Sequence, residues 1–470
     1  MAVLLLMAGC SLTDATEPVL DISIVSPAEG ARYEVGDTIP IVVVPDEPAV
    51  KTMSVWFWAE GDLIAVDSVP PWETRWRTRE GTPLHPEVKV QAFNLPRGTT
   101  TRAAGVEVTW TYQRPTQAGD GWPTATLEEV GLELAPLDSL VKALRARTGH
   151  LIHSIVIARH GKLVFEKYFD GLSHPTWGEK PMSFGPETAD CLSSVTKSFT
   201  ATLLGVAIQR KCVGGVNSRV FDYFPSLADL DVGSKRGMTL RDLVTMRSGL
   251  QWDESSYPLT DARNDLTAWL RRAASTSTDP ARDLLARPMA ALPGAVFNYA
   301  GADPNLLGNA IQRACGMRLD QYAREVLFDP LGVHDDWWWI FPSGFVYASG
   351  DLALRPRDMV KLGQLYLQDG VWNGERVLPP GWVAAATASV SSFDTYRASD
   401  GIVGYGYGWW TLTDAYGARA YEAWGWGGQY IVVMPEHDMV VALTAGSYWS
   451  PAWKNGHQIM TEFVLPAIVS

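Results

Sequence analysis

Residues 20–113 alternate between apolar and polar positions in short runs that turn-forming residues separate. A period of two residues is typical of strands with one buried face. Six such runs lie at residues 21–26, 39–44, 53–58, 63–68, 88–93 and 106–112. Several short strands without a helical period predict a β-sandwich.

A polar stretch rich in Pro and Gly, QRPTQAGDGWP, follows this segment and predicts a linker at residues 114–120. From residue 121 the pattern is mixed. Apolar positions at helical spacing predict helices at residues 126–147, 199–209 and 357–367, and strand-rich runs lie at residues 154–169 and 421–444. Strands at both ends with helices between them predict an α/β domain over residues 121–470. Its sheet is closed by the two ends of the domain, and a helical lobe is inserted.

The length of the chain indicates its number of domains, and its net charge limits the kinds of partner it can bind. A chain of 470 residues exceeds what one hydrophobic core usually supports, so we expect two domains. The formal net charge of −13 argues against a nucleic-acid partner, which normally meets a basic face. It also disfavours electrostatic docking to anionic lipid.

The first ten residues, MAVLLLMAGC, form a short apolar run that ends in small residues and Cys10. This run resembles the end of a bacterial lipoprotein signal, although it lacks basic residues before the apolar part and has Met7 where Leu is usual. We therefore expect residues 1–19 to be a signal or lipoprotein segment, with a possible lipid anchor at Cys10. A plain cleaved signal or a ragged N-terminus is the alternative. A signal of either kind would export the protein, to the periplasm or the cell surface.

Three further cysteines, Cys191, Cys212 and Cys315, leave at least one thiol unpaired. Their spacing fits no zinc pattern, so they are interpreted as buried small residues or one optional disulfide. No His/Cys/Asp cluster is visible along the chain, and no metal or cofactor is implied.

The first chemical signal is Ser194-Val195-Thr196-Lys197, which opens an apolar helix. Residues three apart lie on one helix face, so Lys197 would sit one turn from Ser194. A serine hydroxyl becomes a nucleophile when a neighbouring base takes its proton. Lysine can be that base when apolar surroundings lower its pKa.

Residues 192–208, LSSVTKSFTATLLGVAI, resemble the nucleophile helix of serine β-lactamases, DD-peptidases and their esterase and amide-hydrolase relatives. Further stretches resemble this family in the expected order, at residues 240–254, 293–308, 348–367, 371–383 and 423–435. The resemblance covers residue 120 to the C-terminus and implies a β-lactamase/transpeptidase-like fold. The N-terminal sandwich is similar to the Ig-like domains that bacteria attach to surface enzymes.

The resemblance implies a second catalytic element at Tyr299, where the family has the tyrosine of Y-x-N. A phenol can serve as a base when an ammonium group such as that of Lys197 stabilises the phenolate, and the two would then share one proton. The third position of the motif is Gly301 rather than Asn, which removes an amide that orients substrate and lysine in β-lactamases.

The third element departs further from the family. The K-T-G triplet of β-lactamases aligns with Ala423-Trp424-Gly425, which makes the Trp426 N–H the partner of the Ser194 N–H in an oxyanion hole. A second register, Trp426-Gly427-Gly428 with the Gln429 N–H, stays open. Both registers lack the cation that meets the carboxylate of β-lactams, although an arginine from elsewhere in the fold could supply it.

These features predict a serine hydrolase that cleaves a small ester or amide through an acyl-Ser194 intermediate, as in the carboxylesterase and 6-aminohexanoate-dimer-hydrolase branches. Tryptophans beside the third motif would line an apolar pocket. A β-lactamase or D-amino-acid-specific peptidase acting on cell-wall-like substrates is the alternative. A surface protein that binds without catalysis is the alternative from another class.

Overall fold

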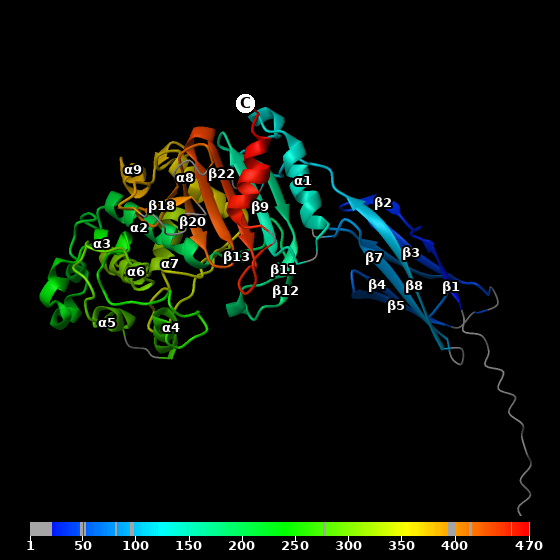
Figure 1. The fold of residues 1–470 in the computed structure, drawn as a ribbon, viewed down its shortest axis with the longest axis horizontal. Coiled ribbons are helices and arrows are strands. Elements are labelled where there is room, and N and C mark those ends of the chain that lie inside the picture. The colour runs from blue at the N-terminus through cyan, green and yellow to red at the C-terminus, as the bar shows by residue number, and fades with distance from the viewer. Residues whose placement is uncertain are drawn as a thin grey trace, which may run out of the picture. The chain divides into compact units, whose positions relative to one another are not determined.

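The alternation of Val, Ile and aromatic residues in the first part of the chain produces two packed sheets (Figure 1). The computed structural model describes residues 21–469 apart from 48–49, 51–52, 80–81, 95–97, 118, 120, 148, 276–278, 393–400, 413–415 and 453. The expected signal segment with Cys10 lies outside the described residues. The chain divides into two compact units, Met1–Thr111 and Tyr112–Ser470.

The first unit is a β-sandwich, as predicted. Its smaller sheet has the order β1 (Ile22–Ser26), β3 (Thr38–Pro45) and β6 (Trp72–Arg77). Its larger sheet has the order β2 (Ala31–Glu34), β8 (Gly98–Thr109), β7 (Glu87–Asn94), β4 (Ser54–Ala59) and β5 (Asp62–Asp67). The sequence pattern missed β2 and β6. Their exposed charged residues obscured the alternation, although Trp72 of β6 is buried in the core.

The second unit is built on one antiparallel sheet whose central strands come from opposite ends of the domain. Its order is β10 (Lys162–Tyr168), β9 (Ile152–Arg159), β22 (Met439–Ala445), β21 (Gln429–Met434), β20 (Ala420–Gly425), β19 (Trp410–Leu412), β18 (Ile402–Tyr405) and β17 (Ser391–Ser392). Val156 of β9 pairs with Ala442 of β22, so the sheet is closed by the two ends of the domain, as expected.

Short strands outside this sheet pair locally: β11 (Asp170–Leu172) with β12 (Pro181–Ser183), β13 (Asp190–Cys191) with β14 (Ala353–Leu354), and β15 (Val371–Trp372) with β16 (Glu375–Arg376). The β13–β14 pair matters for the site, because it fixes the chain just before Ser194.

Helices cover both faces of the large sheet. The N-terminal helix α1 (Leu134–Arg145) contacts the C-terminal helical segment, which begins with α10 (Gly456–Ile459) and continues to Ala467. The opposite face carries α8 (Pro356–Leu367) and, beyond it, the helical lobe (Figure 1). The helices of the lobe and its borders are α2 (Thr196–Gln209), α3 (Leu240–Val244), α4 (Asp265–Ser275), α5 (Pro280–Leu285), α6 (Ala302–Cys315), α7 (Leu319–Ala323) and α9 (Trp382–Ala386). Among the described residues, no helix has the length and apolar character that crossing a membrane requires.

The predicted helix at residues 126–147 is shorter in the structure, where a 3-10 turn (Glu128–Val130) precedes α1. The stretch predicted as a linker is partly anchored to the second unit. Arg114 Nε donates to Thr124 Oγ1 at 2.9 Å, and the Tyr112 hydroxyl donates to Val164 O at 2.8 Å. The sequence pattern did not predict these contacts, because a polar composition does not show which side chains form hydrogen bonds with the second unit.

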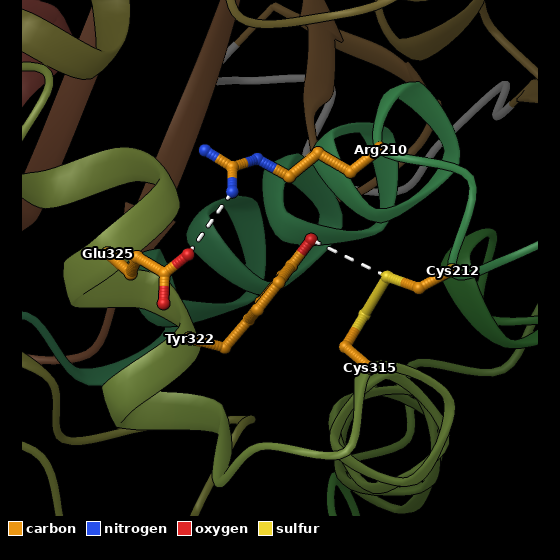
Figure 2. The surroundings of a disulfide bond; sticks show 5 residues. All are labelled: Arg210, Cys212, Cys315, Tyr322 and Glu325. Atoms are coloured by element: carbon orange, nitrogen blue, oxygen red, sulfur yellow. Dashed lines mark hydrogen bonds and ion pairs between the residues drawn. A yellow bond between two sulfur atoms is a disulfide. The ribbon is translucent and has the colours of Figure 1, made fainter.

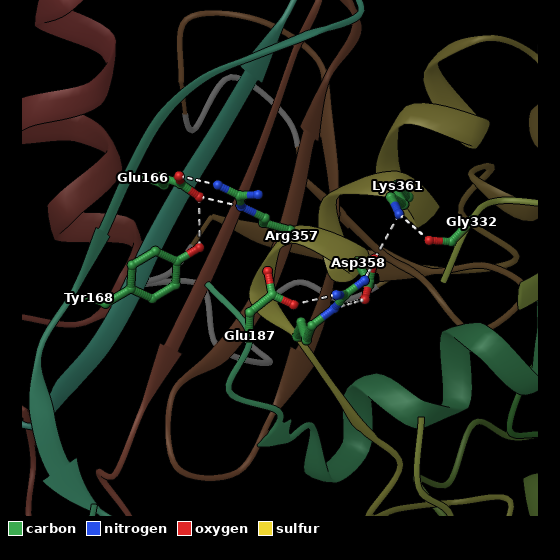
Figure 3. Close-up of polar contacts among 8 residues, drawn as sticks. Glu166, Tyr168, Glu187, Gly332, Arg357, Asp358 and Lys361 are labelled. Carbon is green, nitrogen blue, oxygen red and sulfur yellow. Dashed lines mark hydrogen bonds and ion pairs between the residues drawn. The ribbon is translucent and has the colours of Figure 1, made fainter. Parts of the chain in front are cut away.

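A buried network of charges joins α8 to its surroundings (Figure 3). Asp358 accepts from Arg355 Nε at 2.7 Å and pairs with Lys361 Nζ at 2.8 Å. Arg355 also pairs with Glu187 at 2.6 Å. In the same turn Arg357 pairs with Glu166 of β10. The network therefore connects α8 both to the sheet and to the segment that leads into Ser194.

A disulfide joins Cys212, just after α2, to Cys315 at the end of α6 (Figure 2). The hydroxyl of Tyr322 on α7 donates to Cys212 Sγ at 3.7 Å. Cys191 is a free buried cysteine. The structure thus selects the one-disulfide interpretation of the three cysteines and links two helices of the lobe.

Candidate active site

Ser194 lies in a tight turn, η3 (Ser193–Val195), that leads directly into α2. Ser193 adopts φ 45°, in the left-handed region that residues other than glycine rarely occupy. Leu192 N–H donates to Leu352 O at 2.8 Å, which holds the start of the turn. The turn places Ser194 at the N-terminal end of α2, where the helix dipole favours negative charge on an oxygen.

Lys197 lies one helical turn after Ser194 and is buried. Its Nζ donates to Ser194 Oγ at 2.8 Å and to Ser349 O at 2.7 Å. Burial lowers the pKa of Lys197 to about 8, against the opposing charges of Glu254 and Asp351. A substantial fraction of Lys197 is therefore neutral near pH 8, as a base for the Ser194 hydroxyl requires.

Tyr299 lies in the loop before α6 and faces Lys197. Lys197 Nζ is 5.0 Å from the centroid of the Tyr299 ring. Trp410 of β19 stacks on the same ring, with centroids 5.5 Å apart, and so fixes its plane. Lys197 thus contacts both Ser194 and Tyr299, and the three residues predicted from scattered motifs are neighbours in the fold.

Glu254 is a buried member of the site that the sequence reasoning did not single out. Its Oε2 accepts from Gly301 N–H at 2.7 Å and from Trp252 Nε1 at 2.6 Å. A Cβ at position 301 would lie 2.9 Å from Leu266 Cδ1 and 3.0 Å from Glu254 Oε2. Glu254 and Leu266 therefore occupy the space that a side chain at position 301 would need. The only signal in the sequence was that Glu254 ends a stretch resembling the family.

Strand β20 passes close to the nucleophile turn. A Cβ at Gly425 would lie 2.4 Å from Leu192 O, so only glycine permits this approach. Among the described residues, none accepts a hydrogen bond from Trp426 N–H, and Trp426 lines the same cavity as Ser194. Gln429 is fully buried within the hairpin, and its side chain donates to Ala445 O. This geometry favours the register that starts at Ala423, in which the Trp426 N–H is the candidate oxyanion donor.

A cavity of about 330 Å³ opens in front of Ser194. Most of its wall is apolar or aromatic, formed by Pro175, Leu259, Leu266, Leu270, Trp339, Tyr347, Trp426 and Trp449. Trp424 lies outside this cavity and lines a different one. Ala423 is only 1% exposed and belongs to the hydrophobic core, so the strand presents no charge there. The predicted apolar pocket therefore exists, with Trp426 rather than Trp424 in its wall.

Three side chains beside the cavity, His174, Cys191 and Asp351, bring their ligand atoms within 4.8 Å of one another. The expectation that the chain holds no His/Cys/Asp cluster is therefore wrong, because three separate segments supply this one. Burial raises the pKa of the Cys191 thiol well above its usual value, and the thiol donates to Asp351 Oδ1 at 3.5 Å. Thr176 N–H donates to His174 Nδ1, which leaves the ring proton on Nε2. Within the cluster the Cys191 thiol thus bonds to Asp351, whereas the His174 ring bonds to Thr176 and Ser193. Metal ligation by Cys191 would require loss of the thiol proton.

The chain is similar in sequence to characterised proteins over most of its length. It is 22% identical over 369 residues to the 6-aminohexanoate-dimer hydrolase of Paenarthrobacter ureafaciens, covering 76% of this chain and 89% of that one. It is 28% identical over 283 residues to penicillin-binding protein 4 of Amycolatopsis lactamdurans, covering 53% of this chain and 70% of that one. In three dimensions it resembles a penicillin-binding protein homologue from Caulobacter crescentus, with a TM-score of 0.56, 17% identity, and coverage of 71% and 97% of the two chains.

Family models match both units of the chain. The bacterial Ig domain model matches residues 21–101, within the first unit. The beta-lactamase model matches residues 137–453, which include Ser194, Lys197, Tyr299 and Trp426. The chain belongs to the beta-lactamase family of serine hydrolases and carries a bacterial Ig domain before the catalytic unit.

Proposed function

We propose that this protein hydrolyses a small ester or amide through a covalent acyl-Ser194 intermediate. One observation carries the proposal: buried Lys197, with a pKa lowered to about 8, holds Nζ 2.8 Å from Ser194 Oγ. The amine is then within reach of the hydroxyl proton and is partly neutral at physiological pH.

The reaction follows from these positions. Neutral Lys197 accepts the proton of Ser194 as Oγ attacks the substrate carbonyl, and the negative oxygen forms beside the N–H groups of Ser194 and Trp426. The tetrahedral intermediate collapses, and the leaving alcohol or amine takes a proton from Lys197, with Tyr299 sharing it. Water then attacks the acyl-serine, gives its proton to the same pair of residues, and releases the acid and Ser194.

The apolar wall of the cavity favours ester or amide substrates that carry uncharged, apolar groups next to the scissile bond. Ala423 stands where β-lactamases place a cation, and a charge-assisted contact of that kind contributes about 1.5–3 kcal/mol. We expect short-chain p-nitrophenyl esters or uncharged amides to be hydrolysed much faster than nitrocefin. Efficient turnover of penicillins or cephalosporins, abolished by Ser194→Ala, would instead support a β-lactamase or a peptidase of D-amino-acid substrates.

Labelling with a fluorophosphonate probe tests the nucleophile and separates an enzyme from a surface-binding protein. The wild-type protein should be labelled on Ser194, and Ser194→Ala should lose both the label and esterase activity. Ser139→Ala is the matched control, because Ser139 is exposed on α1 and its hydroxyl donates to Ala135 O within the same helix. Absence of labelling in a folded wild-type protein would favour binding without catalysis.

We also propose that the protein is exported and anchored through a lipid on Cys10. The apolar run before Cys10 supports this, and so does the Cys212–Cys315 disulfide, since disulfides persist in oxidising compartments. Metabolic labelling with a fatty acid in a bacterial host should modify the wild-type chain but not Cys10→Ser. A Cys10→Ser chain that stays in the membrane fraction would contradict the anchor.

A further inference from the structure

Helix α4 (Asp265–Ser275) supplies one wall of the cavity in front of Ser194. Four of its residues line the cavity: Leu266, Thr267, Leu270 and Arg271. These positions repeat at spacings of three and four residues, so they form a single face of the helix. The α4 wall therefore presents an arginine beside apolar side chains, within the same cavity as the nucleophile.

Arg271 differs from the other arginines around it, because it is not engaged within the protein. Arg272 pairs with Asp283 at 3.0 Å, Arg282 with Asp229 at 2.8 Å, and Arg287 with Asp265 at 2.8 Å. Across the part of the chain that the structure describes, Arg271 makes no ion pair or hydrogen bond, and its side chain is exposed. Its guanidinium group is available to an anion that enters the cavity.

Arg271 is also the only lysine or arginine among the described residues that line this cavity. It lies on α4, whereas Ala423, at the position of the family's cation, lies on β20 and is buried. The positive charge of Arg271 therefore lies on a different element from the cation of a β-lactamase. Because Leu266 and Leu270 lie on the same helix face as Arg271, a ligand on this wall can contact apolar groups and the guanidinium together.

We propose that Arg271 determines substrate choice by binding a carboxylate at the end of an apolar chain, while the ester or amide of the same molecule lies at Ser194. This inference rests on the proposed hydrolase function and specifies its substrate class. Guanidinium and carboxylate form paired N–H···O contacts, and the apolar wall contacts the chain between the two groups. The preferred substrates are monoesters or monoamides of dicarboxylic acids rather than esters of simple fatty acids.

Two esters that differ only at the far end of the acyl chain test this directly. Mono-p-nitrophenyl adipate carries a carboxylate where p-nitrophenyl hexanoate carries a methyl group. The ratio of their kcat/KM values, measured for the full chain, isolates the effect of that charge. In Arg271→Gln we expect the adipate-to-hexanoate ratio to fall about five- to tenfold, mainly through KM, since the contact is present in both ground and transition states.

Further variants separate charge recognition from general damage. Arg271→Lys should keep part of the preference, and Arg271→Glu should transfer it to p-nitrophenyl 6-aminohexanoate, whose ammonium group occupies the same end. Arg272→Gln is the matched control, because Arg272 is the next residue and is paired with Asp283 outside the cavity. Raising the ionic strength should reduce the adipate preference of the wild type but not of Arg271→Gln.

The outcomes are distinguishable. An adipate-to-hexanoate ratio that is unchanged in Arg271→Gln, or that falls equally in Arg272→Gln, would overturn the role of Arg271 while leaving the hydrolase intact. Failure of the wild type to cleave either ester, or activity that survives Ser194→Ala, would overturn the proposed function itself. Thermal melting of each variant shows whether it is folded.

Discussion

Lys197 is the residue on which the chemistry of the site depends, and its surroundings act on it in opposite directions. Burial lowers its pKa to about 8, while the charges of Glu254 and Asp351 favour the ammonium form. Only the neutral amine can accept the Ser194 proton. The value of kcat/KM should therefore rise with pH through about 8 and level off above it.

Replacing Glu254 with glutamine tests this balance. Loss of the carboxylate removes one charge that stabilises the ammonium form, so the pKa of Lys197 should fall. The pH range over which kcat/KM rises, the rising limb of its pH profile, should then move to lower pH. The glutamine Oε1 can still accept the bonds that Gly301 and Trp252 now donate to one oxygen. The measurement is the pH profile of kcat/KM, with Glu325→Gln, a surface carboxylate paired with Arg210, as control. A limb that stays in place or moves upward would show that Glu254 does not act on Lys197.

Replacing Gly425 with alanine tests whether β20 must approach the nucleophile turn closely. An alanine Cβ would lie 2.4 Å from Leu192 O and would push the strand away from Ser194. Because displacements of about 1 Å can reduce a rate about a hundredfold, Gly425→Ala should lower kcat by that order. Gly237→Ala is the control, since a Cβ there meets open space. Equal kcat values for the two variants would contradict the required approach.

At the scale of elements, α8 is held by buried charges rather than by apolar packing alone. Asp358 is fully buried between two cations, Arg355 and Lys361. Removal of one member of such a group leaves uncompensated charge in a medium that solvates it poorly. Asp358 should therefore contribute strongly to the stability of the catalytic unit, although it does not take part in the chemistry.

Asp358→Asn should therefore lower the free energy of unfolding by about 3–5 kcal/mol. Glu187→Gln provides the comparison, because Glu187 pairs with the same Arg355 but is 65% exposed, and its loss should cost less than about 1 kcal/mol. Denaturant unfolding of the two variants measures both changes. Similar losses for both would mean that burial does not decide the strength of this network.

The Cys212–Cys315 disulfide acts on the same scale, by joining α2 to α6 across 103 residues of sequence. A crosslink over so long a segment restricts the unfolded chain, and its removal typically costs about 2–5 kcal/mol. A Cys212→Ala/Cys315→Ala chain should melt at a lower temperature than the wild type. Reductant should lower the wild-type melting temperature towards that value and leave the variant unchanged. A wild type that melts at the same temperature with and without reductant would contradict the prediction.

For the whole molecule, the two units have separate hydrophobic cores. That of the sandwich includes Ile41, Phe57 and Val90, whereas the large core of the second unit surrounds α2 and α8. Each core is formed within its own unit. The residues gathered around Ser194 all come from the second unit.

A chain of residues 112–470 should therefore fold and keep kcat/KM for a p-nitrophenyl ester within about twofold of the full-length value. It retains the contacts of Tyr112 and Arg114 that anchor the start of the unit. Residues 21–111 alone should give a cooperative unfolding transition of their own. A shortened chain that is folded but inactive would show that the Ig domain takes part in turnover.

The sequence by itself determined the elements whose signals are local. Alternation identified the sandwich, helical periodicity identified α2 and α8, and the S-x-x-K spacing placed Lys197 one turn from Ser194. These predictions succeeded because strand and helix periods, and contacts three residues apart, are properties of neighbouring positions. The ordered resemblance to the family was enough to predict that Tyr299 lies near Ser194 and Lys197.

Only the tertiary structure decided the contacts between distant segments. Glu254 beside Gly301, the cluster of His174, Cys191 and Asp351, and the cavity wall with Arg271 all join residues that no sequence period relates. The same holds for the choice of cysteines in the disulfide and of Trp426 over Trp424 in the pocket. The physical reason is that a side chain's partner, its burial and hence its charge state depend on which surfaces meet when the sheet closes and the helical lobe packs upon it.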